Sequence, residues 1–169
     1  MEKPKILVVG SMNMDLFVEG ANSIPGFGES IMCGNYGYAT GGKGSNQAIA
    51  AALQGADVTM VGRLGEDTNG ESLKNELKKA GVHTEYIVTD KEKQTGLALM
   101  LLNSDGRYVS YVALGANGSI CAEDVKAALE AEKFDMVIMQ LEMPLETVYR
   151  TYELAKERTF PCSWMRGLR

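Results

Sequence analysis

The stretch KILVVG, residues 5–10, is a short, continuous apolar run that is rich in β-branched residues and ends in glycine. A strand with one wet face alternates apolar and polar residues, whereas an uninterrupted apolar run indicates a strand that is covered on both faces. Residues 5–10 therefore predict a central strand of a parallel sheet, with other elements packed above and below it.

Outward from this strand, helix-like and strand-like patterns alternate along the chain. Helices are predicted at residues 45–53, 70–79, 122–132 and 145–157. Strands are predicted between them at residues 58–64, 86–89 and 136–141. This alternation is typical of an α/β fold, a Rossmann-like parallel sandwich with helices on both faces of the sheet.

Four further strand-like segments do not fit that alternation. They lie at residues 15–19, 30–40, 95–102 and 108–114. The turn NSDG, residues 103–106, joins the last two as a hairpin. We therefore expect a small accessory sheet, built by two excursions of the chain at about residues 14–40 and 95–114.

The composition bounds the class of protein. The chain has 169 residues, 45% of them hydrophobic, and a formal net charge of -5. Without a run of Lys or Arg to offset the acidic background, nucleic acid is not an expected partner. The apolar run at residues 6–9 is too short for a signal-peptide core or a membrane-spanning helix, so we expect a cytoplasmic protein with no membrane partner.

Cysteine and histidine give no sign of a metal site. Cys33, Cys121 and Cys162 are far apart and lack the paired spacing of zinc ligands, so we expect free thiols. His83 has no second His or Cys near it in sequence and is interpreted as a loop residue.

Asn13 and Asp15 stand two positions apart just after the first strand, so in an extended chain their side chains point to the same side. Ligands of open parallel sheets bind outside the carboxyl ends of the strands, and one carboxylate can accept from two vicinal hydroxyl groups. One interpretation is a polyol-binding pair. The other is an Asx turn with a capping Asp, and this feature alone does not decide between them.

The loop GGKGSNQA, residues 41–48, precedes an alanine-rich helical run. Three glycines allow bare backbone to approach a ligand, and amides at a helix amino terminus suit hydroxyl or anionic oxygen. Lys43 would add a positive charge and Asn46 an amide that both donates and accepts. The alternative is a glycine-rich turn with a helix cap.

A nucleotide-binding P-loop is a further alternative, because GYATGGK at residues 37–43 matches the first seven places of its pattern. The eighth place is Gly44 instead of Ser or Thr, so the hydroxyl expected on magnesium is missing. The preceding residues also resemble an accessory strand. The dinucleotide fingerprint GxGxxG does not follow Gly10.

Glu142 follows another buried strand, so we expect its carboxylate at the same edge of the sheet, either at a ligand site or as a capping or exposed acid. The segment GED, residues 65–67, with Gly70 after it, is interpreted as a turn with Asp67 as the N-cap of the next helix.

Five segments together closely resemble the ribokinase-like branch of the PfkB-type carbohydrate kinases. They are GSMNMD at 10–15, the loop at 41–48, GEDTNG at 65–70, GAN at 115–117 and QLE at 140–142. The resemblance covers about residues 4–158 and implies a parallel α/β sandwich with a small β-sheet lid. Lys in the GGKG loop and the Asn-Gln after it look more like this branch than like the fructokinases or adenosine kinases.

The resemblance also implies a site and its ligands. The residues that would bind the sugar are Asn13, Asp15, Gly41, Gly42, Lys43, Asn46 and Glu142. The implied activity is the phosphorylation of D-ribose to D-ribose 5-phosphate by ATP, with Mg²⁺ and a monovalent cation such as K⁺. Dimerisation through the lid is also implied, because family members often associate in that way.

The family's catalytic segment Gly-Ala-Gly-Asp, its Asn-x-x-Glu segment and its adenine-binding region have no counterpart here, so no catalytic residue is assigned. We expect a truncated fold that is inactive alone, because phosphoryl transfer needs a base, an anion hole and phosphate contacts. The alternatives are a non-catalytic sugar-binding or regulatory fragment, or a kinase of another pentose or of a nucleoside.

The final segment TFPCSWMRGLR, residues 159–169, does not resemble a strand, although the alternation requires one there. Reading the Trp164 and Met165 codons one base early gives Asp, and the flanking codons then permit an apolar strand followed by a turn. We expect residues from about 159 onward to be out of frame and the native protein to be about twice as long. The alternative is a natural short paralogue with a new tail.

Overall fold

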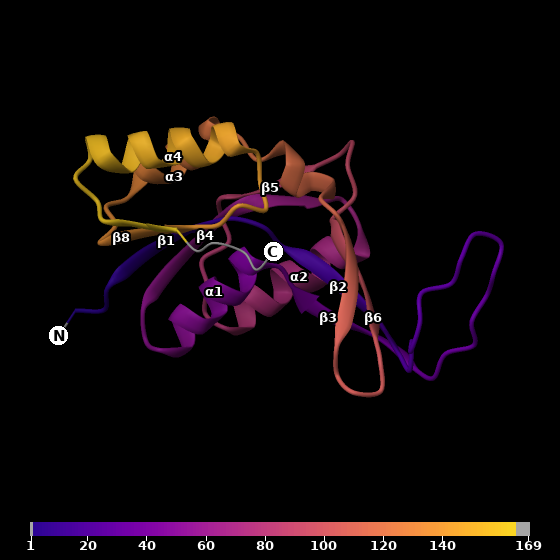
Figure 1. Cartoon of the computed structure of the whole chain (residues 1–169). Coiled ribbons are helices and arrows are strands. Elements are labelled where there is room, and N and C mark those ends of the chain that lie inside the picture. The colour runs from indigo at the N-terminus through magenta and orange to yellow at the C-terminus, as the bar shows by residue number, and fades with distance from the viewer. Residues whose placement is uncertain (1, 165–169) are drawn as a thin grey trace.

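A five-stranded parallel sheet forms the centre of the larger layer in the computed structural model, which describes residues 2–164 (Figure 1). Its strands are β1 (Lys5–Val9), β4 (Asp57–Gly65), β5 (Ile87–Asp90), β8 (Met136–Met139) and β9 (Cys162–Trp164). Their order is β5-β4-β1-β8-β9, and β1 pairs in parallel with both β4 and β8. The prediction of a central strand at the start of the chain is confirmed.

Helices cover both faces of this sheet (Figure 1). Helices α1 (Lys43–Leu53) and α2 (Thr68–Lys79) lie on one face, and α3 (Ala122–Ala131) and α4 (Leu145–Glu157) lie on the other. Leu7 and Val9 of β1 are fully buried in the cluster with α3 and α4, while Val8 between them is buried in the cluster with α1 and α2. Burial of each such side chain stabilises the fold by roughly 1.5–3 kcal/mol, which explains the unbroken apolar run.

The second sheet has four strands and is mixed. They are β2 (Asn13–Glu19), β3 (Tyr36–Gly41), β6 (Gly96–Leu102) and β7 (Tyr108–Ala113), in the order β3-β2-β6-β7. Strands β2 and β6 are parallel, whereas β2 with β3 and β6 with β7 are antiparallel. The hairpin predicted between β6 and β7 is confirmed, and Asn103 N donates to Arg107 O at 2.9 Å across its turn. We call this sheet the lid sheet.

The strand predicted over residues 30–40 is wrong for its first half. Strand β3 begins at Tyr36, and the pairing with β2 fades at Glu19, whose amide donates to Asn35 O and whose carbonyl accepts from Gly34 N. Beyond Glu19 the partner strand has ended, so residues 20–33 have no ladder to join and form a long loop (Figure 1).

The expectation that the tail contains no strand is also wrong, because Cys162–Trp164 form β9 beside β8. Phe160 and Cys162 pack against the apolar cluster under α4, and Pro161 O accepts from Val137 N at 2.9 Å. Residues 162–164 thus form a strand because they pair with the otherwise open edge of β8, although their sequence is not typical of a strand. Residues 165–169 lie outside the described part of the chain, and the frameshift stays a prediction.

The cysteines, His83 and the lengths of the helices were also considered in the sequence. The three cysteines are free. His83 pairs with Asp57, at 2.8 Å from Nε2 to Oδ1. Over residues 2–164, none of the helices combines the length and apolarity that crossing a membrane requires.

Candidate functional site

Lys43 and Glu142 form an ion pair where α1 meets the end of β8, although they lie 99 residues apart in sequence. Lys43 is the first residue of α1, and Glu142 follows β8 after two intervening residues. Their side chains are 40% and 21% exposed, so a molecule from solvent can reach both groups. The expectation that Glu142 lies at the carboxyl edge of the sheet is therefore met, and the structure places it beside the start of α1.

Ser11 holds this ion pair in place. Its hydroxyl donates to Glu142 Oε2 at 2.8 Å and accepts from the Lys43 amide at 3.1 Å. Ser11 is fully buried in the turn between β1 and β2. Burial favours the protonated form of Glu142, but the hydrogen bonds from Lys43 and Ser11 and the charge of Lys43 outweigh it, so the pKa of Glu142 lies below its ordinary value.

Asp15 belongs to the same group of side chains. A Cβ on Gly41, in the neighbouring strand, would lie 2.2 Å from Asp15 Oδ2, so the missing side chain of Gly41 is what makes room for the carboxylate. Burial raises the pKa of Asp15 above its ordinary value, the charge of Glu142 raises it further, and Lys43 partly offsets both. Two carboxylates with opposite pKa shifts therefore share this site.

Asn13 begins β2 and is almost completely buried. Its Oδ1 accepts from Asn117 Nδ2 at 2.8 Å, and the strand alternation puts Asn13 on the same side of β2 as Asp15. The structure thus brings Ser11, Asn13, Asp15, Lys43 and Glu142 to the junction of the two sheets. We call these five residues the junction cluster.

The glycines of the loop allow the chain segments to meet. Gly42 has φ +97°, and a Cβ there would lie 2.7 Å from Asn13 N, while a Cβ on Gly44 would lie 2.7 Å from Ser11 O. A residue larger than glycine would separate α1 from the β1–β2 turn. The helix-cap interpretation of the loop is confirmed, because Gly42 is the N-cap of α1. Ligand binding by the loop stays a prediction.

The predicted role of the helix amides needs correction. We expected amides at the start of this helix to be available to a ligand, but the Lys43 amide donates to Ser11 Oγ and the Ser45 amide donates to Ser11 O at 3.1 Å. Asn46 lies one turn further along α1 and is exposed, three residues from Lys43 and so on the same side of the helix.

The P-loop alternative is contradicted by the structure. Residues 37–41 lie in β3 and pair with β2 over Asn13–Phe17, so they are extended and cannot wrap around a phosphate group. A P-loop requires its glycine-rich residues in the turn that links a strand to a helix.

The GED segment is structural, as predicted. Asp67 is the N-cap of α2 and accepts from Gly70 N at 2.8 Å, and it also accepts from the amide and hydroxyl of Thr95 at 2.8 and 2.7 Å. These bonds tie the start of α2 to the residue before β6. Burial opposes the ionisation of Asp67, but the bonds from Thr95 and Gly70 outweigh it and lower its pKa.

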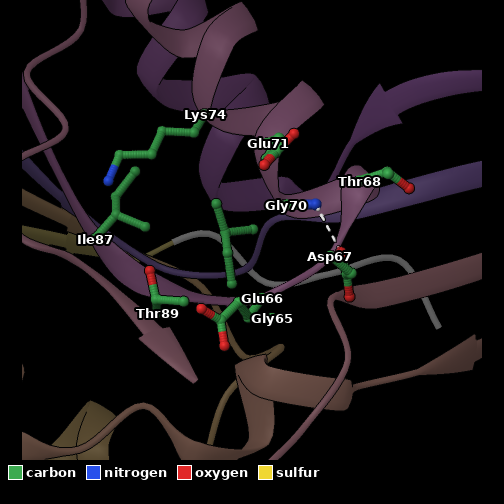
Figure 2. A pocket seen from close by; sticks show the side chains of 10 residues that line it. Gly65, Glu66, Asp67, Thr68, Gly70, Glu71, Lys74, Ile87 and Thr89 are labelled. Atoms are coloured by element: carbon green, nitrogen blue, oxygen red, sulfur yellow. Dashed lines mark hydrogen bonds between the residues drawn. The ribbon is translucent and has the colours of Figure 1, made fainter. Parts of the chain in front are cut away.

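A cavity of about 400 Å³ lies beside Asp67, at the edge of the larger sheet (Figure 2). Figure 2 shows Glu71 and Lys74 extending from α2, with Ile87 and Thr89 contributed by β5. No residue of the junction cluster lines this cavity. The residues at the two places are therefore distinct.

Sequence reasoning missed three residues that support the site. Ser11 and Asn117 lay within matched segments but received no role. Gln140 is fully buried and donates to Gln47 of α1, next to Gly10, where a Cβ would lie 1.8 Å from Gln140 Oε1. A buried polar residue beside a glycine was the available signal, but only the fold shows which partner it meets.

Residues 3–166 match the pfkB family carbohydrate kinases. This chain belongs to the PfkB family. Its PfkB relatives include the ribokinase of Bacillus subtilis, 42% identical over 144 residues, which are 85% of this chain and 48% of that protein. The ribokinase of Staphylococcus aureus is 35% identical over 90% of this chain and 50% of its own length.

Solved structures of PfkB members have the same fold. The ribokinase of Arabidopsis thaliana, complexed with ribose and ATP, superimposes with a TM-score of 0.81 at 30% identity, over 97% of this chain and 53% of that one. The ribokinase of Cryptococcus neoformans in complex with ADP gives 0.79 at 28% identity, over 97% of this chain and 49% of that one. This PfkB chain thus spans about half the length of the relatives it matches.

Proposed function

We propose that this chain binds ribose at the junction cluster and contributes the sugar-binding part of a kinase that phosphorylates ribose at the expense of ATP. The observation that carries the proposal is the convergence of four polar side chains from three separate parts of the chain. Asn13 and Asp15 come from β2, Lys43 from the start of α1 and Glu142 from the segment after β8. Support also comes from the family membership and from the ribose and ATP bound to the similar Arabidopsis ribokinase.

The chemistry of the cluster suits a polyhydroxylated sugar. The carboxylates of Asp15 and Glu142 accept hydrogen bonds from hydroxyl groups, and hydrogen bonds to an ionised group are stronger than neutral ones. Lys43 and Asn13 donate to hydroxyl oxygens. Gly41 leaves room for the Asp15 carboxylate, and Gly42 lets the start of α1 approach Asn13. Asn46 adds an exposed amide near Lys43.

ATP, Mg²⁺ and K⁺ come to this proposal from the family resemblance. Among residues 2–164, no group of three or more His, Cys, Asp or Glu side chains is arranged to hold a metal ion, and we derive no step through Mg²⁺. The part played by this chain is to bind and orient the sugar hydroxyls.

Calorimetry with ribose tests the sugar site. We expect measurable heat of binding, with the affinity reduced by at least about tenfold in Asp15→Asn, because a charged acceptor is replaced by a neutral amide. Asp105→Asn, at the exposed turn of the lid sheet, is the matched control and should bind like the wild type. The absence of heat at millimolar ribose would refute the proposal.

Substrate choice is tested with the same instrument. The deoxyribokinase of Salmonella typhimurium is 32% identical over 90% of this chain and 50% of its own length. We propose ribose as the preferred ligand over deoxyribose, other pentoses and nucleosides, and tighter binding of any of these would reassign the substrate.

A non-catalytic sugar-binding or regulatory protein is the second candidate. It is supported by the observation that the junction cluster contains groups suited to hydrogen-bond a sugar, with Lys43 paired to Glu142 and Ser11 bonded to both. An ATP-coupled assay separates the candidates, since ribose-dependent ADP formation by this chain supports the kinase, and ribose binding without it supports the binding protein.

We further propose that the protein dimerises through the lid sheet. Several large apolar side chains of this sheet and its loop are exposed, namely Phe27, Met32, Tyr36, Tyr38, Tyr111 and Val112. Light scattering should give twice the monomer mass for the wild type and the monomer mass for Tyr111→Arg. The control Tyr152→Arg changes another exposed tyrosine, on α4, and should remain dimeric. A monomeric wild type at micromolar concentration refutes the proposal.

A further inference from the structure

Asn117 is a fully buried amide at the point where the chain leaves the lid sheet. It lies in the 3₁₀ helix η1 (Gly115–Ser119), which is separated from the end of β7 by Leu114 alone. Its Oδ1 accepts from Met12 N at 2.9 Å, and its Nδ2 donates to Met12 O at 3.1 Å and to Asn13 Oδ1 at 2.8 Å. One side chain thus connects the exit of the lid sheet to its entry, 105 residues earlier.

The backbone of Met12 fixes which way the Asn117 amide faces. If the amide were turned over, its NH₂ group would face the Met12 amide and its oxygen would face the Met12 carbonyl, so two hydrogen bonds would become repulsive contacts. Asn117 must therefore present NH₂ hydrogens to Asn13, and Asn13 must present Oδ1 in return. The Nδ2 hydrogens of Asn13 are then left to point away from Asn117.

Gly96 provides the space for this arrangement. It pairs with Asn13 in the β2–β6 ladder, and a Cβ at this position would lie 2.2 Å from Asn117 Nδ2 and 2.3 Å from Asn13 Oδ1. Real Cβ atoms do not approach polar atoms so closely, so any other residue at position 96 would push the two amides apart. The Asn13–Asn117 bond therefore depends on three chain segments that meet here, namely the start of β2, the start of β6 and η1.

We propose that Asn117 is the positioning residue for Asn13 and presents that side chain to the sugar as a hydrogen-bond donor. An isolated Asn amide rotates between two nearly equivalent orientations, one offering a donor and the other an acceptor. Locking one of them selects a ligand oxygen at that position of the ring and removes the entropy cost of ordering Asn13 on binding. This inference rests on the proposed function only for the identity of the ligand.

Asn117→Asp tests the inference by ribose calorimetry. The carboxylate still accepts from Met12 N but can no longer donate, so Asn13 turns over and offers oxygen to the ligand. We expect the ribose Kd to rise about tenfold or more, and to change less than twofold when the substitution is made in an Asn13→Ala background. Thr147→Val is the control, because it also removes a buried hydrogen bond, that to Ile120 O, away from the junction cluster.

Gly96→Ala provides a second test that removes no polar group. It should weaken ribose binding to a similar extent by separating Asn13 from Asn117. Gly118→Ala, in the same 3₁₀ helix as Asn117, meets only ordinary contacts at 3.7 and 4.0 Å and should bind like the wild type. Equal ribose affinity of Gly96→Ala and wild type would contradict the inference.

A measurement without sugar separates this inference from the proposed function. The side-chain amide protons of Asn13 should give two sharp NMR signals in the wild type, and exchange-broadened or shifted signals in Asn117→Ala. Unchanged signals overturn the positioning role whether or not ribose binds. If ribose binds the wild type and Asn117→Asp within twofold of each other, the positioning role is wrong and the sugar site stands.

Discussion

Ser11 donates its hydroxyl hydrogen to Glu142 across 2.8 Å, although the two residues lie 131 positions apart in the chain. The same oxygen accepts from the first amide of α1, so one buried hydroxyl joins the end of β1, the end of β8 and the start of a helix. The ion pair of Lys43 and Glu142 is therefore anchored to the core of the parallel sheet.

Ser11→Ala should raise the pKa of Glu142, because the ionised carboxylate loses a donor while its burial remains. It should also lower the free energy of unfolding by about 1 kcal/mol, since the partly buried Lys43 amide loses its acceptor. Carboxyl NMR titration and denaturant unfolding measure the two effects. Ser104→Ala removes an exposed bond to Asn22 and is expected to change neither; an unaltered Glu142 titration in Ser11→Ala would contradict the argument.

Asp15→Asn should bind ribose more weakly and yet make the stability of the protein less sensitive to a rise in pH from 4 to 7. The pKa of Asp15 is raised in the folded state, so its stabilising contribution is present below the ordinary pKa, near pH 4, and is lost as the pH rises through the raised value. The free energy of unfolding should thus fall less between pH 4 and pH 7 in the variant than in the wild type. If the free energy of unfolding changes with pH in the same way in both proteins, ionisation of Asp15 does not destabilise the fold.

Gly42→Ala should destabilise the fold by more than about 2 kcal/mol, since it combines a left-handed φ with a contact that has no room for a Cβ. Gly55→Ala separates the two causes. Gly55 has nearly the same φ, +96° against +97°, but its Cβ would meet nothing within 4 Å, so only the conformational cost of about 1 kcal/mol remains. Equal loss of stability in the two variants would mean that the close approach of α1 to Asn13 is unimportant.

Asp67→Ala should destabilise the contact between the start of α2 and Thr95, the residue before β6. Its carboxylate accepts from two groups of Thr95 and caps α2, so we expect a loss of about 1–3 kcal/mol and faster amide hydrogen exchange at Thr95. Because the pKa of Asp67 is lowered in the folded state, this contribution is present at neutral pH and disappears as the pH falls through that value. Asp105→Ala should leave amide exchange at Thr95 unchanged. Unchanged exchange at Thr95 in Asp67→Ala would show that the Asp67 carboxylate does not protect this amide.

The sequence was sufficient for the elements whose periodicity is strong. The apolar run of β1 and the alternation of helices with strands correctly indicated a parallel sheet with two covered faces, because burial on both faces leaves that pattern. The errors at residues 30–35 and 162–164 have one cause. In both places the structure depends on whether a neighbouring strand is still present, and local sequence does not carry that information.

The same limit applies to the site. Asn13, Asp15 and Glu142 could be predicted to converge because the carboxyl ends of parallel strands share one edge of a sheet. The roles of Ser11 and Asn117 could not, since each depends on partners more than 100 residues away. The amides of Lys43 and Ser45, at the start of α1, were expected to be available to a ligand, but both donate to Ser11.

The lid sheet is built from two excursions whose strands are joined by the parallel pairing of β2 with β6. Residues 13 and 96 pair only after the intervening chain has become compact, because closing so long a loop costs entropy that other contacts must first offset. We therefore expect the parallel layer to fold first and the hairpins to dock afterwards. During synthesis on the ribosome, Asn13 and Asp15, which we propose bind the sugar, would emerge early and acquire their final geometry only after the segment around Asn117 has been translated.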